Sequence, residues 1–206
     1  MRFMPYSRIF STSLSATASM SCSPASSARL AITGFTAKVD TAAMAAIAHE
    51  HGLPLVVDAD ALNLLAINPD KRHNRVITPH PGEAARLLGC SIAEIEDDRL
   101  LCAQRLVKRY GGVVVLKGAG TVVAAEQAEL GIIDTGNAGM ASGGMGDVLS
   151  GIIGALLGQK LTPYDAACAG CVAHGAAADV LAARYGTRGM LATDLFTTLQ
   201  RIVNPD

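Results

Sequence analysis

The chain has 206 residues, half of them hydrophobic, and a formal net charge of −1. This length suits one sizeable globular domain, and the balanced charge indicates neither nucleic acid nor an anionic membrane as a partner. No uncharged apolar run reaches the roughly 18 to 20 residues that span a bilayer. Five cysteines without regular spacing are typical of a reducing compartment rather than of a disulfide scaffold.

The first 39 residues have a composition of their own. They hold nine serines between Ser7 and Ser27, and the first acidic residue of the chain is Asp40. An organelle transit peptide has this composition, and so does a stretch that was never selected to fold, such as a spurious start. We expect residues 1–39 to be disordered and to lie outside the domain, residues 40–206. We favour the spurious start, in a protein of the bacterial cytoplasm.

From residue 40 the sequence becomes regular. Capping residues and helical spacing predict helices at 40–50, 81–88 and 91–111, the last opened by a Ser-x-x-Glu capping box. Short apolar runs at 54–58 and 75–79 predict two strands that are buried on both faces. Strands and helices that alternate in this way indicate an α/β fold with a mainly parallel sheet flanked by helices.

The second half of the domain continues the pattern. A third buried strand is predicted at 113–117, with 121–125 and 130–134 as hairpin partners. Three helices follow, one led by glycines, one begun by Thr162 and Pro163 and one begun by Thr193. The Cys-x-x-Cys pair Cys168 and Cys171 lies in an alanine-rich stretch at helical spacing, so we interpret both cysteines as small core residues rather than as metal ligands.

A glycine-rich loop leads into the first of these helices. Gly143, Gly144, Met145 and Gly146 precede an uncharged apolar helix, and the first turn of a helix offers free N–H groups to an anion. These residues could form a phosphate loop, or the glycines could serve only close helix packing, as Gly151, Gly154 and Gly158 would. Asp147 favours the first alternative, because a carboxylate beside a phosphate pocket makes sense mainly as a base or as a group that faces Mg²⁺.

Other polar residues follow the carboxyl ends of the strands, where ligands of such sheets bind. His80 stands between two prolines, and it is either a structural or surface residue or a site residue. Lys117 ends a buried strand and needs either an anion or a route by which its ammonium group reaches solvent. A nucleotide phosphate is a natural partner for it. Glu83 could favour the start of its helix or organise water around Mg²⁺.

Four segments carry a family resemblance, in this order: VVDADALNLLA (56–66), ITPHPGEAARLLG (77–89), VVLKGAGT (114–121) and GNAGMASGGMGDVLSGIIGALL (136–157). The chain resembles the ADP-dependent NAD(P)H-hydrate dehydratases, carbohydrate-kinase-like repair enzymes with a ribokinase-like fold. The resemblance covers about residues 40–206. It implies a hydro-lyase that dehydrates the S epimer of hydrated NADH or NADPH with ADP as co-substrate and Mg²⁺ as cofactor, giving NAD(P)H, AMP and phosphate.

The resemblance also implies roles for individual residues. The nucleotide would be bound by Gly146 and by the loop Lys117, Gly118, Ala119, Gly120 and Thr121. His80 and Asp147 would face the hydrated nicotinamide, with Asp147 as the catalytic base. The N–H groups of Gly144, Met145 and Gly146 would hold the transferring phosphoryl group.

The sequence departs from the family at its start. Members of the family begin with further strands and a Gly-Pro-Gly loop, and here only SSARLAITGF (26–35) stands in that place. We therefore expect a domain that lacks its leading strands, and two alternatives stay open besides the dehydratase. One is a small-molecule kinase of the same fold, and the other is a remnant that binds nucleotide without turnover. The apolar helices of the last 60 or so residues would suit a homo-oligomer interface.

Overall fold

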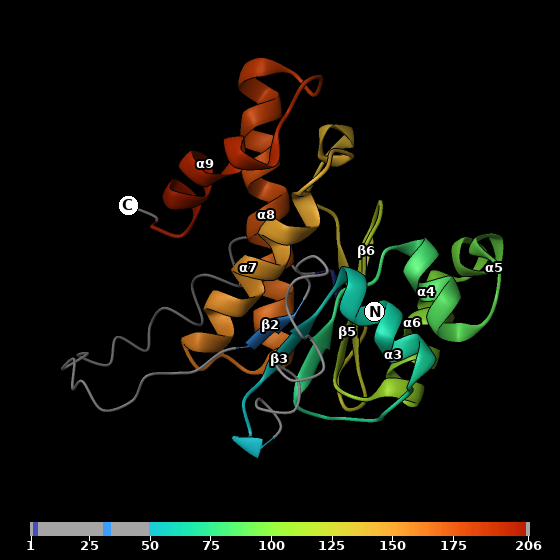
Figure 1. Cartoon of the computed structure of the whole chain (residues 1–206). Coiled ribbons are helices and arrows are strands. Elements are labelled where there is room, and N and C mark those ends of the chain that lie inside the picture. The colour runs from blue at the N-terminus through green and yellow to red at the C-terminus, as the bar shows by residue number, and fades with distance from the viewer. Residues whose placement is uncertain (1, 4–30, 34–49, 205–206) are drawn as a thin grey trace.

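The computed structural model describes residues 2–3, 31–33 and 50–204 of the chain (Figure 1). Its strands are β1 (Arg2–Phe3), β2 (Ala31–Thr33), β3 (Leu55–Val57), β4 (Arg75–Ile77), β5 (Val113–Leu116), β6 (Thr121–Ala125) and β7 (Gly131–Ile133). Its α-helices are α3 (Ala59–Ile67), α4 (Pro81–Leu88), α5 (Ile92–Asp97), α6 (Arg99–Tyr110), α7 (Met145–Gly158), α8 (Pro163–Tyr185) and α9 (Leu195–Ile202). Two short 3₁₀ helices are η1 (Ala138–Met140) and η2 (Ala192–Asp194).

The strands form one sheet in the order β1-β7-β6-β5-β4-β3-β2. Neighbours from β2 to β5 run parallel, while β6 is antiparallel to both β5 and β7. The α/β prediction and the hairpin prediction for β6 and β7 are both confirmed. A parallel run of strands matters for function, because it brings the carboxyl ends of β3, β4 and β5 to one edge.

Helices cover both faces of the sheet (Figure 1). Leu55 and Val57 of β3 belong to the core beneath α3, α4 and α6, whereas Val56 belongs to the core beneath α7 and α8. Successive side chains of a strand point to opposite faces, so a strand covered on both faces must be apolar throughout. This requirement explains the short uninterrupted apolar runs of β3, β4 and β5.

Two short strands lie where the sequence predicts none. Ala31–Thr33 pairs in parallel with Leu55–Val57, and Arg2–Phe3 pairs in parallel with β7. The expectation that the first 39 residues contribute no strand is therefore wrong at these five positions. Both strands lie in the serine-rich stretch before residue 40, whose composition indicates disorder, and each is set by pairing with a strand far along the chain rather than by a local pattern. The other residues of the predicted disordered segment, and most of the helix predicted at 40–50, lie outside the described residues.

The helix predicted at 91–111 is in fact two helices. α5 begins at the Ser91 capping box as expected, but Asp98 ends it and caps α6 by accepting a hydrogen bond from the N–H of Leu101 at 2.8 Å. Aspartate is a favoured N-cap residue, and the spacing of apolar residues gives no signal of the break between the two helices. At the end of the domain, η2 occupies the predicted helix start at Thr193, and α9 begins at Leu195.

Helix α8 packs closely against its neighbours through two glycines that the sequence analysis did not single out, and of the three predicted packing glycines only Gly154 is buried. A Cβ at Gly170 would lie 2.8 Å from Cγ1 of Ile153, and one at Gly175 would lie 2.4 Å from Oγ1 of Thr135. Gly151 and Gly158 instead face open space. The first contact seats α8 against α7, and the second seats it against the residues that follow β7.

Helix α8 is also long and apolar enough to cross a membrane by length and composition, but 72% of its most apolar window is buried inside the protein, as in a core helix. Cys168 and Cys171 are buried in it without a disulfide, and burial raises the pKa of Cys168 to about 11. Both cysteines are core residues, as predicted.

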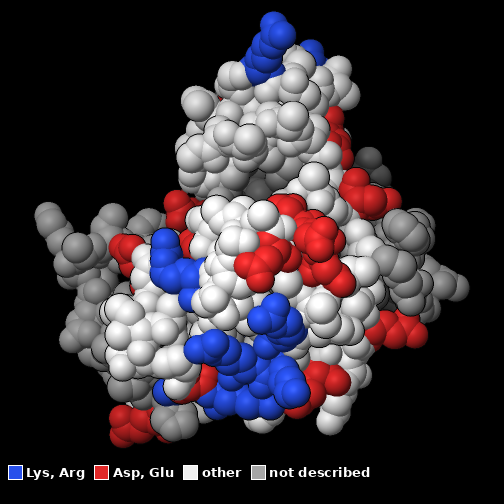
Figure 2. All heavy atoms as spheres, turned by 90° about the vertical axis from the view of Figure 1, so that its right-hand side faces the viewer, with Lys and Arg blue, Asp and Glu red and all other residues white. Residues whose placement is uncertain are grey.

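The surface carries both signs of charge. Figure 2 shows the side of the molecule that lies at the right in Figure 1, where basic side chains gather in one patch and acidic side chains gather directly above it. This face therefore does not present a continuous field of one sign to a ligand or partner.

Candidate active site

A cavity of about 850 Å³ opens at the carboxyl ends of the strands. Its walls are the loop 117–121, most of residues 133–142, the first turn of α7 and the middle of α8. Eight of the predicted site residues line it: His80, Lys117, Gly118, Ala119, Gly120, Thr121, Met145 and Gly146. The four others, Glu83, Gly143, Gly144 and Asp147, lie outside this lining.

The first turn of α7 has no side-chain cap. Its N-cap residue is Gly144, whose φ of 86° is in the left-handed region that favours glycine, and no side chain accepts a hydrogen bond from the turn. Gly146 of this turn lines the cavity. The first N–H groups of the helix, together with the positive end of its dipole, are therefore available to an anion in or beside the cavity.

Asp147 belongs to the same turn but lies outside the cavity lining. Successive residues of a helix are about 100° apart around its axis, so Gly146 and its neighbour face different directions. The Asp147 side chain is exposed, and its carboxylate makes no hydrogen bond or ion pair within the described part of the chain. A free carboxylate beside an anion-binding turn can accept a proton from a ligand.

Lys117 has a protein carboxylate as its partner. Its Nζ lies 2.8 Å from Oδ1 of Asp58 and 3.8 Å from Oε2 of Glu83, and its side chain is 20% exposed. A Cβ at Gly146 would lie 3.3 Å from this ammonium group, so the glycine allows the lysine to reach the first turn of α7. The anion beside Lys117 in the structure is thus Asp58, and a nucleotide phosphate would be a second partner.

Asp58 was not among the predicted site residues. It is 5% exposed, and its carboxylate also accepts hydrogen bonds from Ser150 Oγ at 2.9 Å and from the N–H of Ala59 at 2.9 Å. The side chain therefore joins the ends of β3 and β5 to helix α7. Its position after a buried strand was the available signal, but the sequence does not show that Ser150, 92 residues away, is its partner.

His80 and Glu83 cap helix α4 together. Nδ1 of His80 accepts from the N–H groups of Gly82 at 3.0 Å and Glu83 at 3.4 Å, and Glu83 Oε2 accepts from the N–H of His80 at 2.7 Å. Because Nδ1 is an acceptor, the proton of the neutral imidazole is on Nε2. The imidazole is 56% exposed at the rim of the cavity, so this N–H can also meet a ligand.

Glu83 has the first of its two predicted roles. Its carboxylate is 10% exposed and engaged in the cap. Within the described residues, no three His, Cys, Asp or Glu side chains are grouped as a metal site. Among these residues, then, the protein does not form a cage for Mg²⁺, and a role of Glu83 toward the ion through water stays a prediction.

Three polar side chains of the cavity wall lack hydrogen-bond partners. Thr135 Oγ1, Ser142 Oγ and His174 Nε2 are buried, and none has a partner within the described chain. Burial lowers the pKa of His174 to about 4, and the charge of Lys117 adds to the shift, so this imidazole is neutral at pH 7. A buried polar atom without a partner costs about 1–3 kcal/mol. Three of them around one cavity indicate that it accommodates a polar ligand.

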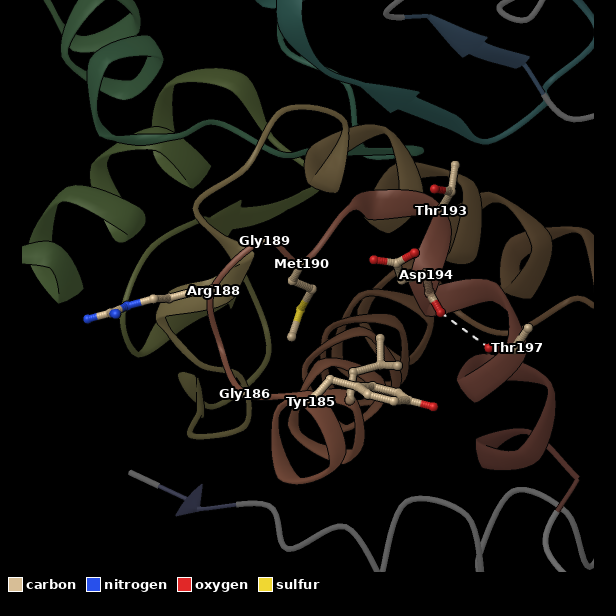
Figure 3. Close-up of a pocket in the computed structure, with 9 residues that line it drawn as sticks. Tyr185, Gly186, Arg188, Gly189, Met190, Thr193, Asp194 and Thr197 are labelled. Carbon is tan, nitrogen blue, oxygen red and sulfur yellow. Dashed lines mark hydrogen bonds between the residues drawn. The ribbon is translucent and has the colours of Figure 1, made fainter.

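A second, smaller cavity of about 440 Å³ lies between the end of α8 and α9 (Figure 3). Tyr185, Met190 and Asp194 line it, and the Arg188 side chain points away from it. None of the predicted site residues is in this cavity, and its drawn hydrogen bond, from Thr197 Oγ1 to the carbonyl of Asp194 at 3.3 Å, is internal to the start of α9. The cavity of about 850 Å³ is therefore the candidate active site.

The mixed sheet with helices on both faces and a polar cavity at the strand ends defines an α/β protein with the ribokinase-like fold. The NAD(P)H-hydrate dehydratase family matches residues 18–201, and the chain belongs to this family.

Individual relatives agree with the family assignment. The bifunctional NAD(P)H-hydrate repair enzyme Nnr of Escherichia coli is 88% identical over 153 residues, which cover 74% of this chain and 30% of that protein. The ADP-dependent (S)-NAD(P)H-hydrate dehydratase of Neisseria meningitidis is 44% identical over 168 residues, 78% of this chain and 57% of its own length. The aligned part thus spans about a third to just over half of these relatives.

A solved structure extends the comparison to three dimensions. The ADP/ATP-dependent NAD(P)H-hydrate dehydratase from Bacillus subtilis, co-crystallised with ATP and Mg²⁺, matches with a TM-score of 0.73 and 28% sequence identity. The match covers 84% of this chain and 63% of that chain.

Proposed function

We propose that this chain catalyses the ADP-dependent dehydration of the S epimer of hydrated NADH or NADPH, a metabolite-repair reaction that yields NAD(P)H, AMP and phosphate. The observation that carries the proposal is the first turn of α7. On this one turn, Gly146 lines a cavity with three unpaired polar side chains, while the carboxylate of Asp147 is exposed and unpaired among the described residues. The arrangement supports a nucleotide on one side of the turn and a hydroxyl substrate on the other.

In the first step, the carboxylate of Asp147 takes the proton of the C6 hydroxyl of the hydrated nicotinamide ring. The hydroxyl oxygen attacks the β-phosphorus of ADP, so that a new O–P bond forms and the bond from the β-phosphorus to the bridging oxygen breaks, releasing AMP. The N–H groups at the start of α7 stabilise the charge on the transferring group. Hydroxide is a poor leaving group, and the transfer converts it into phosphate.

In the second step, the lone pair of the ring nitrogen expels phosphate from C6. Loss of a proton from the neighbouring ring carbon then restores the dihydropyridine. A kinase of this fold would stop after the transfer, whereas here the phosphorylated product collapses. The residues of this chain thus need only bind, orient and deprotonate, and the ring supplies the electrons for elimination.

We propose that Mg²⁺ arrives with the nucleotide. The ion usually keeps several waters and is held by one or two carboxylates together with substrate phosphates. The co-crystallisation of the Bacillus subtilis enzyme with ATP and Mg²⁺ supports this proposal. Asp58 and Glu83, whose carboxylates lie 2.8 and 3.8 Å from Nζ of Lys117, would be the groups that face the ion or its waters.

The proposal is tested with the purified 206-residue chain, hydrated NADH and ADP. We expect equal amounts of absorbing NADH, AMP and free phosphate. A stable phosphoester without free phosphate would identify a small-molecule kinase instead. ADP binding without any turnover would identify a nucleotide-binding remnant, so the three alternatives give three different results.

We also propose that the chain is a homo-oligomer of the bacterial cytoplasm. Tyr185, Leu191 and Phe196, near α9, are 78%, 60% and 57% exposed, which supports a subunit contact there. The four described cysteines are free thiols, which supports a reducing compartment. Light scattering of the purified chain tests whether it is a homo-oligomer. Import of a reporter fused to residues 1–39 into an organelle would contradict the location in the bacterial cytoplasm.

A further inference from the structure

Arg99 lies behind the loop 117–121 and outside the cavity. Its Nη2 donates hydrogen bonds to the carbonyl oxygens of Leu116 at 3.0 Å and Lys117 at 3.1 Å. Its Nη1 donates to Glu96 Oε1 at 3.0 Å, and the side chain is 15% exposed. One guanidinium group of helix α6 is thus attached to the last residue of β5 and to the first residue of the loop.

These two carbonyl groups stand at the end of β5, where Leu116 is its last residue paired with β6, opposite Val122. The parallel register of β5 with β4 ends at Val114, and the last bond to that side is from the N–H of Lys117 to the carbonyl of Pro79 at 2.9 Å. Buried carbonyl groups at a strand end need a donor from elsewhere. Arg99 supplies it, and a planar, always charged guanidinium suits two adjacent acceptors.

The loop is shaped around this guanidinium. A Cβ at Gly118 would lie 2.8 Å from both Nη1 and Nη2 of Arg99, so the group packs directly against the glycine backbone. Gly118 also has a φ of 147°, and Thr121 Oγ1 donates to its carbonyl at 3.1 Å. The turn is therefore fixed from behind by Arg99 and from within by Thr121, while its other side faces the cavity.

We propose that Arg99 is a positioning residue for nucleotide binding. It holds the loop 117–121 in the conformation that presents its backbone to the cavity, and it does not touch the nucleotide. The identity of the ligand as a nucleotide rests on the proposed function, whereas the order of the loop does not. Arg99 also fixes the backbone from which the Lys117 side chain reaches Asp58, so both the loop and the ammonium group depend on it.

Hydrogen exchange of the ligand-free protein tests the positioning role without any ligand. In Arg99→Gln, we expect the amides of residues 117–121 to exchange at least about tenfold faster, because two charge-assisted hydrogen bonds are lost. The amides of β5 and α6 should keep their protection. Arg99→Lys, which can still donate to one carbonyl, should fall between the wild type and Arg99→Gln. Unchanged exchange in the loop, or equal acceleration throughout the sheet, would overturn the proposal.

Calorimetry with ADP then measures the consequence for binding. We expect the Kd of Arg99→Gln to rise on the order of tenfold. In turnover assays, the KM for ADP should rise while kcat changes little. Arg105→Gln is the matched control, since Arg105 is exposed on the same helix and interacts with Glu94 and Cys102 rather than with the loop.

The two proposals fail in different ways. A wild-type chain that binds ADP without dehydrating NADH hydrate would contradict the proposed function and leave the Arg99 comparison intact. An Arg99→Gln chain with faster loop exchange but unchanged ADP affinity would show that the loop does not need its order to bind, which would overturn the role in nucleotide binding.

Discussion

Replacing Asp58 by alanine would remove the carboxylate that joins two strand ends to α7. Lys117 would lose its partner at 2.8 Å and, among the described residues, keep Glu83 alone, 3.8 Å away, and the buried Ser150 hydroxyl would lose its acceptor. Breaking a buried ion pair costs about 3–5 kcal/mol. Because the Lys117 side chain is 20% exposed, water recovers part of this cost, and we expect a loss of about 3 kcal/mol in the free energy of unfolding.

Urea unfolding measures this loss as a lower midpoint at an unchanged slope. Asp58→Asn keeps the shape and an oxygen for Ser150, so it should lose roughly half as much. Asp60→Ala is the matched control two residues along the chain, because Asp60 is exposed and accepts only a 3.4 Å hydrogen bond from Asn63. Its effect should stay within about 0.5 kcal/mol. If Asp58→Ala unfolded as the control does, the ion pair would contribute nothing to stability.

Three further predictions concern the site. Asp147→Asn should abolish turnover and leave the affinity for AMP unchanged, since the amide keeps the shape and loses the base; phosphate release near the wild-type rate would make Asp147 a structural residue. If the Lys117 ammonium contacts the β-phosphate, Lys117→Ala should weaken the binding of ADP more than that of AMP, by about 1–3 kcal/mol. Equal losses of affinity for both nucleotides in calorimetry would place the ammonium group elsewhere. His174 has a lowered pKa in the folded protein, so between pH 6.5 and about 4 only the unfolded chain binds the proton. The stability that this difference contributes above pH 6.5 is therefore lost as the pH falls to about 4. Urea midpoints should fall over this range in the wild type and stay flatter in His174→Gln.

Local patterns were enough for the main elements of the fold. The uninterrupted Val56–Val57 and Val113–Val115 runs indicate strands covered on both faces, and Pro81 marks the observed start of α4. Where a single polar side chain decides a boundary, the pattern fails. Asp98 divides one predicted helix into two, although apolar spacing continues through both.

The candidate site was predicted in part, for a similar reason. Glycine loops and strand ends are local signals, and they lead to Gly146 and Lys117. The partners of buried polar groups are set by tertiary contacts: Asp58 and Lys117 are 59 residues apart, and their meeting depends on the order of the strands. His174 stands in an alanine-rich helix, where nothing in the neighbouring residues indicates that it borders a cavity.

The glycines of α7 and α8 set a limit on attempts to engineer a more robust variant. Substituting alanine for a helical glycine usually raises stability by about 0.5–1 kcal/mol. Gly151 faces open space, so Gly151→Ala should follow that rule and raise the melting temperature. At Gly175 the same change would press a methyl group against Thr135, whose hydroxyl lies 2.4 Å from the new Cβ. Close packing and the shape of the cavity therefore both require glycine at position 175, and heat-resistant designs of this chain should leave that position alone.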